Sequence, residues 1–134
     1  MLRFDAARLQ TILPHRPPFL LPERVDVLEP GVCGVGFRLI RPDDPYLTVD
    51  EHGAPCFPWF LALELLAQTG AVVSASGHPE DLAAAGPQPG FLAAVSLRGL
   101  APIALGRELV GTVRIQKAWG RFIMAASSGR FAAS

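Results

Sequence analysis

The sequence predicts a single α+β domain, residues 1–134, in which an antiparallel sheet wraps around one long central helix. Residues 57–76 are almost free of helix breakers and apolar nearly all round, which is typical of a helix buried on most faces. Strand-like runs lie on both sides of this stretch. With 134 residues, half of them hydrophobic, the chain suits one core. A buried helix cannot cover itself, so the strands must form a sheet around it.

The elements before the long helix can be taken in order. Residues 4–13 have apolar side chains at helical spacing, with Asp5 in a capping position, and we expect a short helix that ends at Pro14. Residues 25–28 and 32–40 alternate apolar and polar side chains around a Glu-Pro-Gly turn, which predicts a pair of strands. Residues 41–55 are polar and rich in proline, and we expect a loop there.

The second half of the chain alternates breakers and strand-like runs. Residues 77–90 are rich in glycine and proline and predict a loop, with a helical turn at 80–85. Three further runs at 91–98, 108–119 and 122–132 are separated by glycine-containing turns and predict strands. The predicted order is therefore helix, two strands, long helix and three strands.

Composition excludes several classes of function. Twelve basic and twelve acidic residues give a net charge of zero, and without a basic tract we expect no nucleic-acid partner. Cys33 and Cys56 lack metal-ligand spacing, and no glycine-rich phosphate loop follows a strand, so neither a metal nor an organic cofactor is expected. The N-terminus does not resemble a signal peptide, and Glu64 and Gln68 interrupt the longest apolar stretch. We expect a cytoplasmic protein without membrane insertion.

Residues 12–24, with the sequence ILPHRPPFLLPER, form the most unusual segment. Proline restricts its own φ and the residue before it, so four prolines predict a stiff, irregular connector. The neighbouring Phe and Leu residues favour burial. His15 and Arg16 are then costly to bury unless they find partners. Such a segment is expected beside a site or an interface.

The long helix carries two polar residues on one face. Glu64 and Gln68 are four positions apart, and Pro58 suits the start of the helix. Burial in an apolar helix disfavours an ionised carboxylate, and a carboxyl that keeps its proton can act as a general acid. The alternative is structural: Glu64 would be partly buried and bonded to the N-terminal loop, for instance to Arg16.

These two motifs resemble those of the β-hydroxyacyl-acyl-carrier-protein dehydratases of the FabA/FabZ type. LPHRPPFLL with Arg24-Val25 is similar to the family's opening signature, and Pro58, Glu64, Ala67 and Gln68 match its helix pattern. The resemblance implies the hot-dog fold, whose element order is the predicted one, and an acyl-ACP or acyl-CoA thioester substrate. It also implies that Glu64 exchanges a proton with the β-hydroxyl or a bound water, while Gln68 orients it or supports the helix.

The chain departs from that family at its histidine. Counting back from Glu64, the position of the family's base falls on Asp50, and the HFPG core is absent. His52 could replace the base, Asp50 itself could act as one, and His15 is a third candidate that could equally support the loop. The candidate catalytic residues are Glu64, His52 and His15. The candidate substrate-binding residues are Gln68, Trp59, Phe57 and Arg16.

A divergent dehydratase-like branch associated with aryl-polyene gene clusters resembles the chain more closely. The similarity extends over residues 12–113 and includes the Pro-Trp-(x)₄-Glu-(x)₃-Gln helix, Gly90-Phe91-Leu92, Arg98 and the spacing of Pro102 and Gly106. Three functions follow. The first is a 3-hydroxyacyl-ACP dehydratase of fatty-acid or polyene-type synthesis. The second is a catalytically degenerate subunit that binds acyl chains or pairs with an active paralogue, and the third is a hot-dog thioesterase. Each implies a homodimer or a heterodimer with a paralogue.

Overall fold

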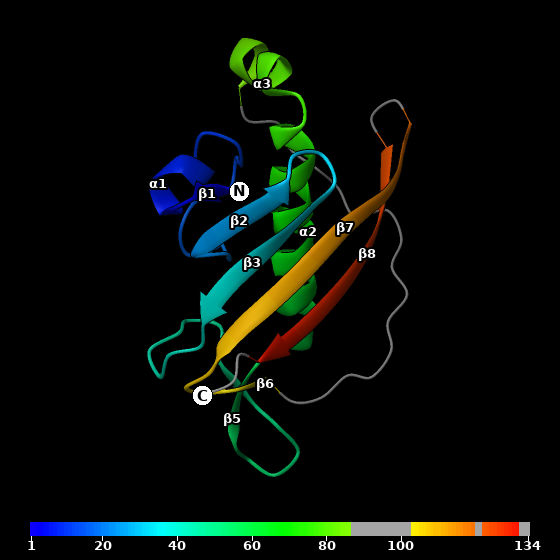
Figure 1. Ribbon diagram of the computed structural model, residues 1–134. Helices are drawn as coiled ribbons and strands as arrows, with labels where there is room; N and C mark the ends of the chain where they lie inside the picture. The colour runs from blue at the N-terminus through cyan, green and yellow to red at the C-terminus, as the bar shows by residue number, and fades with distance from the viewer. Residues whose placement is uncertain (87–102, 120–121, 132–134) are drawn as a thin grey trace.

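A five-stranded antiparallel sheet crosses the long helix α2 (Trp59–Ser76) obliquely (Figure 1). The computed structural model describes residues 1–86, 103–119 and 122–131. In spatial order the strands are β1 (Leu2–Phe4), β2 (Arg24–Glu29), β3 (Cys33–Leu39), β7 (Glu108–Trp119) and β8 (Phe122–Phe131). Helix α2 contacts β2, β3, β7 and β8. The predicted architecture, a sheet around one central helix, is confirmed.

The sheet approaches α2 closely because glycines face it. A Cβ atom on Gly36 would lie only 2.1 Å from Thr69 Oγ1, and one on Gly111 would lie 2.6 Å from a methyl carbon of Leu66. A larger residue at either position would require the facing side chain of α2 to shift. These two glycines therefore allow α2 to lie close to the sheet.

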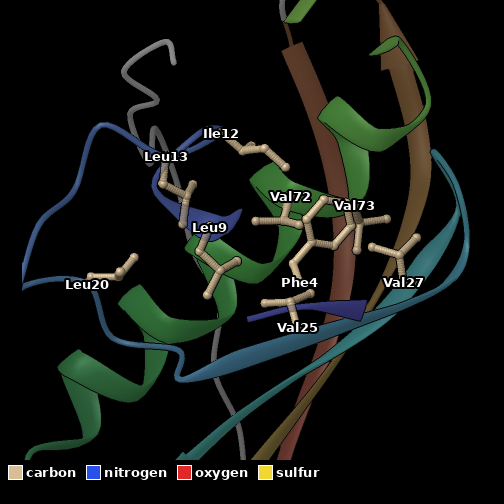
Figure 2. Close-up of a cluster of buried hydrophobic side chains, with 9 residues drawn as sticks. All are labelled: Phe4, Leu9, Ile12, Leu13, Leu20, Val25, Val27, Val72 and Val73. Atoms are coloured by element: carbon tan, nitrogen blue, oxygen red, sulfur yellow. The ribbon is translucent and has the colours of Figure 1, made fainter. Parts of the chain in front are cut away.

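Buried side chains form two clusters, one toward each end of α2. Figure 2 shows the first, in which side chains from β1, the α1 segment, β2 and the second half of α2 converge. Its members are Phe4, Leu9, Ile12, Leu13, Leu20, Val25, Val27, Val72 and Val73. The second surrounds the first half of α2 and contains Leu21, Ile40, Phe57, Leu61, Leu65, Ile103 and Leu109. The proline-rich segment at residues 12–24 contributes Leu20 to the first cluster and Leu21 to the second.

The N-terminal segment differs from the expected helix over residues 4–13. Residues 2–4 form β1, in which Phe4 pairs with Val25 of β2, and only Ala6–Leu9 are helical, as α1. Pairing with β2 satisfies backbone groups that a helix would otherwise use. Asp5 does cap α1, because its side chain accepts a hydrogen bond from the backbone N–H of Arg8.

The region predicted as a loop contains a second, smaller sheet. Its strands are β4 (Thr48–Val49), β5 (Pro55–Phe57) and β6 (Ile103–Ala104), in that order. Strands this short carry too few residues for an alternating pattern to be visible in the sequence. Phe57 therefore lies in β5, and α2 begins at Trp59, after Pro58 in an extended conformation.

Three other expectations have clear outcomes. The paired strands β2 and β3 and the strands β7 and β8 occur where predicted, and the helical turn at 80–85 is the short helix α3 (Pro79–Ala85). The expected strand at 91–98 lies outside the described residues, as do Arg98 and Pro102. By length and composition alone α2 could cross a membrane, although Glu64 and Gln68 interrupt its apolar stretch. Its packing against the sheet nevertheless makes it a core helix.

Candidate functional site: Glu64, Gln68 and the opening loop

Glu64 lies in the middle of α2 and faces the proline-rich loop formed by residues 14–22, called here the opening loop. Its Oε1 atom lies 3.3 Å from Gln68 Nε2 and 3.6 Å from His15 Nε2. The side chain keeps 29% of its surface exposed, so the deep burial expected from the apolar helix is not observed. The structure instead places two nitrogen atoms next to a single carboxylate oxygen.

Gln68 connects α2 to the opening loop. Its Oε1 accepts a hydrogen bond from the Leu21 backbone N–H at 3.0 Å, and its Nε2 donates to the Phe19 carbonyl at 3.0 Å and to Glu64 Oε1. The residue is only 1% exposed. Since Leu21 N–H can donate only to an oxygen, these contacts determine which way the amide points. The amide nitrogen must face Glu64.

Arg16 supports the loop rather than Glu64. Its guanidinium donates to the backbone carbonyls of Leu13 at 2.9 Å, His15 at 2.8 Å and Gln10 at 3.3 Å. The expected alternative of a Glu64–Arg16 contact is therefore not observed, and Arg16 is directed at backbone rather than at an open substrate site. Three carbonyls around one planar guanidinium hold the chain on both sides of His15.

His15 is the histidine that the structure brings next to Glu64. Its ring centroid lies 5.9 Å from that of Phe19, and its side chain is 21% exposed. Its Nδ1 atom is buried and has no hydrogen-bond partner among the described residues. Only Nε2 is directed toward a polar group, the Glu64 carboxylate.

The other two base candidates lie in the hairpin between β4 and β5. Asp50 Oδ1 accepts from the backbone N–H groups of His52 at 2.8 Å and Ala54 at 2.9 Å, so its carboxylate closes the turn. The His52 side chain is 82% exposed, and its Nε2 lies 3.6 Å from Glu51 Oε1. Within one chain, neither residue joins the Glu64 cluster.

Phe57 and Trp59 lie at the start of α2 but differ in exposure. Phe57 is buried in the second core cluster at 1% exposed, which argues against its expected role in an open substrate site. Trp59 is 48% exposed and makes an edge-to-face contact with the neighbouring Phe60, which is also exposed. Of the two residues, Trp59 remains available to a ligand or a second chain.

Arg38 is a supporting residue that the sequence did not reveal. It donates through Nη1 to the Leu21 carbonyl at 2.9 Å, pairs through Nη2 with Asp44 at 2.6 Å, and lies over the ring of Phe57. Both side chains of the ion pair are largely buried. The end of the opening loop is thus held by Gln68 through the Leu21 N–H and by Arg38 through the Leu21 carbonyl. Arg38 and Asp44 are six positions apart, and this spacing carries no recognisable signal in the sequence.

Two other features, an apolar hollow and a cluster of exposed polar residues, do not form a convincing binding site. A small apolar hollow of about 10 Å³ lies between α2 and β7, lined by Ala62, Leu65, Leu66, Leu109 and Gly111. It is smaller than a typical ligand pocket. His78, Glu80 and Asp81 come close together at the start of α3, but all three are exposed, and such groups are common without an ion.

Comparison with known proteins places this geometry in a family. No family model matches the chain. A curated protein named 3-hydroxyacyl-[acyl-carrier-protein] dehydratase FabZ from Cereibacter sphaeroides (strain ATCC 17025) is 32% identical over 120 residues, which are 90% of this chain and 76% of that protein. FabZ of Chloroflexus aggregans is 47% identical over 68 residues, or 51% of this chain and 47% of that protein.

A third relative and a solved structure agree with this placement. FabZ of Anaeromyxobacter sp. (strain Fw109-5) is 42% identical over 80 residues, or 58% of this chain and 51% of that protein. The chain therefore spans about half the length of two of these relatives and three quarters of the Cereibacter protein. A solved structure described as the dehydratase heterocomplex ApeI:P from Xenorhabdus doucetiae has the same fold, with a TM-score of 0.72 and 19% identity over 92% of this chain and 80% of that one.

A central helix wrapped by an antiparallel sheet is the hot-dog fold, which the chain shares with the ApeI:P structure. The extended match to the Cereibacter protein makes the assignment specific. This chain belongs to the FabZ family of 3-hydroxyacyl-[acyl-carrier-protein] dehydratases.

Proposed function

We propose that the chain is a 3-hydroxyacyl-ACP dehydratase-like protein in which Glu64 is the general acid. The observation that carries the proposal is the position of the Glu64 carboxyl, held on one oxygen by Gln68 at the face of α2 that meets the opening loop. Membership of the FabZ family supports the substrate class, an acyl thioester on a carrier protein.

Dehydration requires two proton transfers, one from the substrate to a base and one from an acid to the departing hydroxyl. A base removes the α-proton of the 3-hydroxyacyl thioester, the bond between the β-carbon and the hydroxyl oxygen breaks, and a carbon–carbon double bond forms. Glu64 gives its proton to the departing hydroxyl, which leaves as water. The base then holds the α-proton and Glu64 is ionised, so transfer of that proton from the base to Glu64, directly or through water, restores the starting state.

We also propose that a second protomer supplies the base. The position of the family's histidine is Asp50, which is occupied by the turn, and His52 is directed away within its own chain. In a homodimer the exposed His52 of one copy would reach the Glu64 of the other. In a heterodimer a paralogue would bring the family's histidine, and the ApeI:P structure is a precedent for a two-component dehydratase.

The test is incubation of the purified protein with a 3-hydroxyacyl-ACP, with loss of water followed by mass spectrometry. The chain is assayed alone and together with a paralogous dehydratase that has the histidine, in parallel with Glu64→Gln and His52→Ala. Homodimer catalysis predicts activity of the chain alone and loss in both variants. Heterodimer catalysis predicts activity only with the paralogue and no effect of His52→Ala. Activity that survives Glu64→Gln in both arms would contradict the role of Glu64.

The same experiment distinguishes the alternative activities. We propose that the protein works in the cytoplasm, where carrier-protein thioesters are made, on an ACP or CoA thioester. Release of free acid in place of an unsaturated thioester would identify a thioesterase. Binding without turnover in every arm would identify an acyl-binding subunit.

A further inference from the structure

We propose that His15 is a positioning residue that directs its Nε2–H at Glu64 Oε1, so that Glu64 carries its transferable proton on Oε2. This inference rests on the proposed function for its catalytic meaning, but its hydrogen-bond geometry can be tested without a substrate. It concerns which atom of Glu64 reacts and which residue of the opening loop controls that choice.

The first step concerns Gln68. Its amide orientation is determined by Leu21 N–H, and the amide nitrogen, which only donates, lies 3.3 Å from Glu64 Oε1. A proton on Oε1 would face this N–H and repel it. A proton on Oε2 leaves Oε1 as an acceptor in both the neutral and the ionised carboxyl. The position of Gln68 therefore favours Oε2 as the oxygen that gains and loses a proton.

The second step concerns the tautomer of His15. Its Nε2 lies 3.6 Å from the same Oε1, while its Nδ1 is buried and has no hydrogen-bond partner in the part of the chain that the structure describes. A buried N–H without an acceptor is costly, and a carboxylate oxygen can only accept. Both facts place the imidazole hydrogen on Nε2 when the ring is neutral. The 3.6 Å separation is longer than a hydrogen bond, and such contacts commonly tighten when substrate binds.

The third step separates positioning from base catalysis. A base that takes an α-proton needs a nitrogen lone pair facing the substrate. With Nε2 directed at Glu64 and Nδ1 buried, neither nitrogen of His15 offers one. The backbone that carries the ring is held because Arg16 binds the carbonyls of Leu13 and His15, and Gln68 binds that of Phe19, whose ring lies beside the imidazole. The opening loop thus works through Glu64 and not on the substrate directly.

The primary experiment is long-range ¹H–¹⁵N NMR of the histidine side chains in the full-length protein, which reports the tautomer of each neutral imidazole. Neutral His15 is expected to show the Nε2–H form. In Glu64→Leu, which removes the acceptor, that preference should weaken. His78 in the same spectra is the internal control, because it is exposed beside α3 and has no part in the proposed chemistry, so it should not respond to Glu64→Leu.

A predominant Nδ1–H form in the wild type would overturn the proposal, as would a His15 pattern unchanged by Glu64→Leu. This readout needs no turnover, so failure of the proposed function and failure of this inference are distinguishable. Absence of dehydration in every arm of the assay would contradict the first and leave the NMR result to decide the second.

Kinetics of two His15 variants give the matched test in the active form of the protein. His15→Leu removes the donor, and kcat is expected to fall about 10- to 100-fold with KM changed less than about twofold. His15→Gln retains an N–H donor and should stay within about tenfold of wild type. Equal losses in the two folded variants would show that a titrating imidazole is required and would overturn the positioning role.

Discussion

The opening loop and the β4–β5 hairpin both carry a histidine within a proline-containing stretch, but they differ in what their polar groups bind. Gln68 and Arg38 bind backbone groups of the opening loop from α2 and β3. In the hairpin, the Asp50 carboxylate binds N–H groups of the same turn. As a result the His15 side chain is 21% exposed and faces Glu64, whereas that of His52 is 82% exposed.

This difference shows that distance along the sequence is a poor guide to which histidine accompanies Glu64. His52 is twelve residues from Glu64 and His15 is forty-nine, yet His15 is the one in contact. The reason is that buried Gln68 on α2 binds the backbone of the opening loop, which places His15 beside the helix. A histidine in a turn that satisfies its own hydrogen bonds has no such constraint.

The largest loss of stability is expected when the hydrogen bonds of Gln68 to the opening loop are removed. Gln68→Met keeps the length of the side chain but leaves the Leu21 N–H and Phe19 carbonyl without their partner. Unsatisfied buried groups of this kind should lower the free energy of unfolding by about 2–4 kcal/mol, measured by urea denaturation. His52→Ala is the matched control in the other loop and should change it by less than about 0.5 kcal/mol. Similar losses of stability in the two variants would contradict the conclusion that only the opening loop is held by buried hydrogen bonds to α2.

A smaller effect is expected from Arg16→Lys. An ammonium group cannot reach the three carbonyls that the planar guanidinium binds, so the loop should loosen around His15. We expect a loss of about 1 kcal/mol and faster amide hydrogen exchange in residues 13–21. Exchange in the β4–β5 hairpin should remain at the wild-type rate. Faster exchange in both loops would indicate that they are coupled rather than independent.

Substitutions at Asp50 ask whether that residue belongs to the turn or to the chemistry. Asp50→Asn keeps the side-chain oxygen that accepts from His52 and Ala54 N–H, and it should stay within about 0.5 kcal/mol of wild type. Asp50→Ala removes that acceptor, but water reaches the exposed turn, so the loss should be no more than about 1 kcal/mol. Dehydration abolished by Asp50→Asn would reveal a catalytic carboxylate and contradict the turn assignment.

The smallest expected change in stability comes from an ion pair outside both loops, between Arg3 and Asp26. This pair makes the free energy of unfolding depend on pH. The Arg3 guanidinium, at 2.7 Å from Asp26, lowers the pKa of this carboxyl from its ordinary value of 3.8. The folded-state pKa is lowered, so the stabilisation is present above about pH 4 and is lost as the pH falls through the folded-state value. Arg3 is largely exposed, so screening keeps the effect small. Arg3→Gln should lower the free energy of unfolding slightly near pH 7, and the difference from wild type should disappear toward pH 2, so that the acid side of the stability curve is flatter, measured by urea titrations between pH 2 and 7.

The sequence by itself determined most of the fold and part of the site. The apolar stretch at 57–76 required a buried helix, and the alternation around Glu29-Pro30-Gly31 required paired strands, because periodicity reports directly which faces are buried. The i, i+4 spacing of Glu64 and Gln68 placed both on one face of α2. The FabZ-like motifs indicated the family, which the match to the Cereibacter protein bears out.

Tertiary structure decided what those residues do. The short strands β1, β4, β5 and β6 form because partners distant in sequence offer backbone hydrogen bonds, which no local pattern records. Gln68 selects the opening loop over the hairpin because the Leu21 N–H and Phe19 carbonyl reach it within 3.0 Å. Arg38 and Asp44 pair only after β3 and the following loop are folded. The contact between His15 and Glu64 thus depends on packing between segments far apart in the chain, since hydrogen bonds act through space.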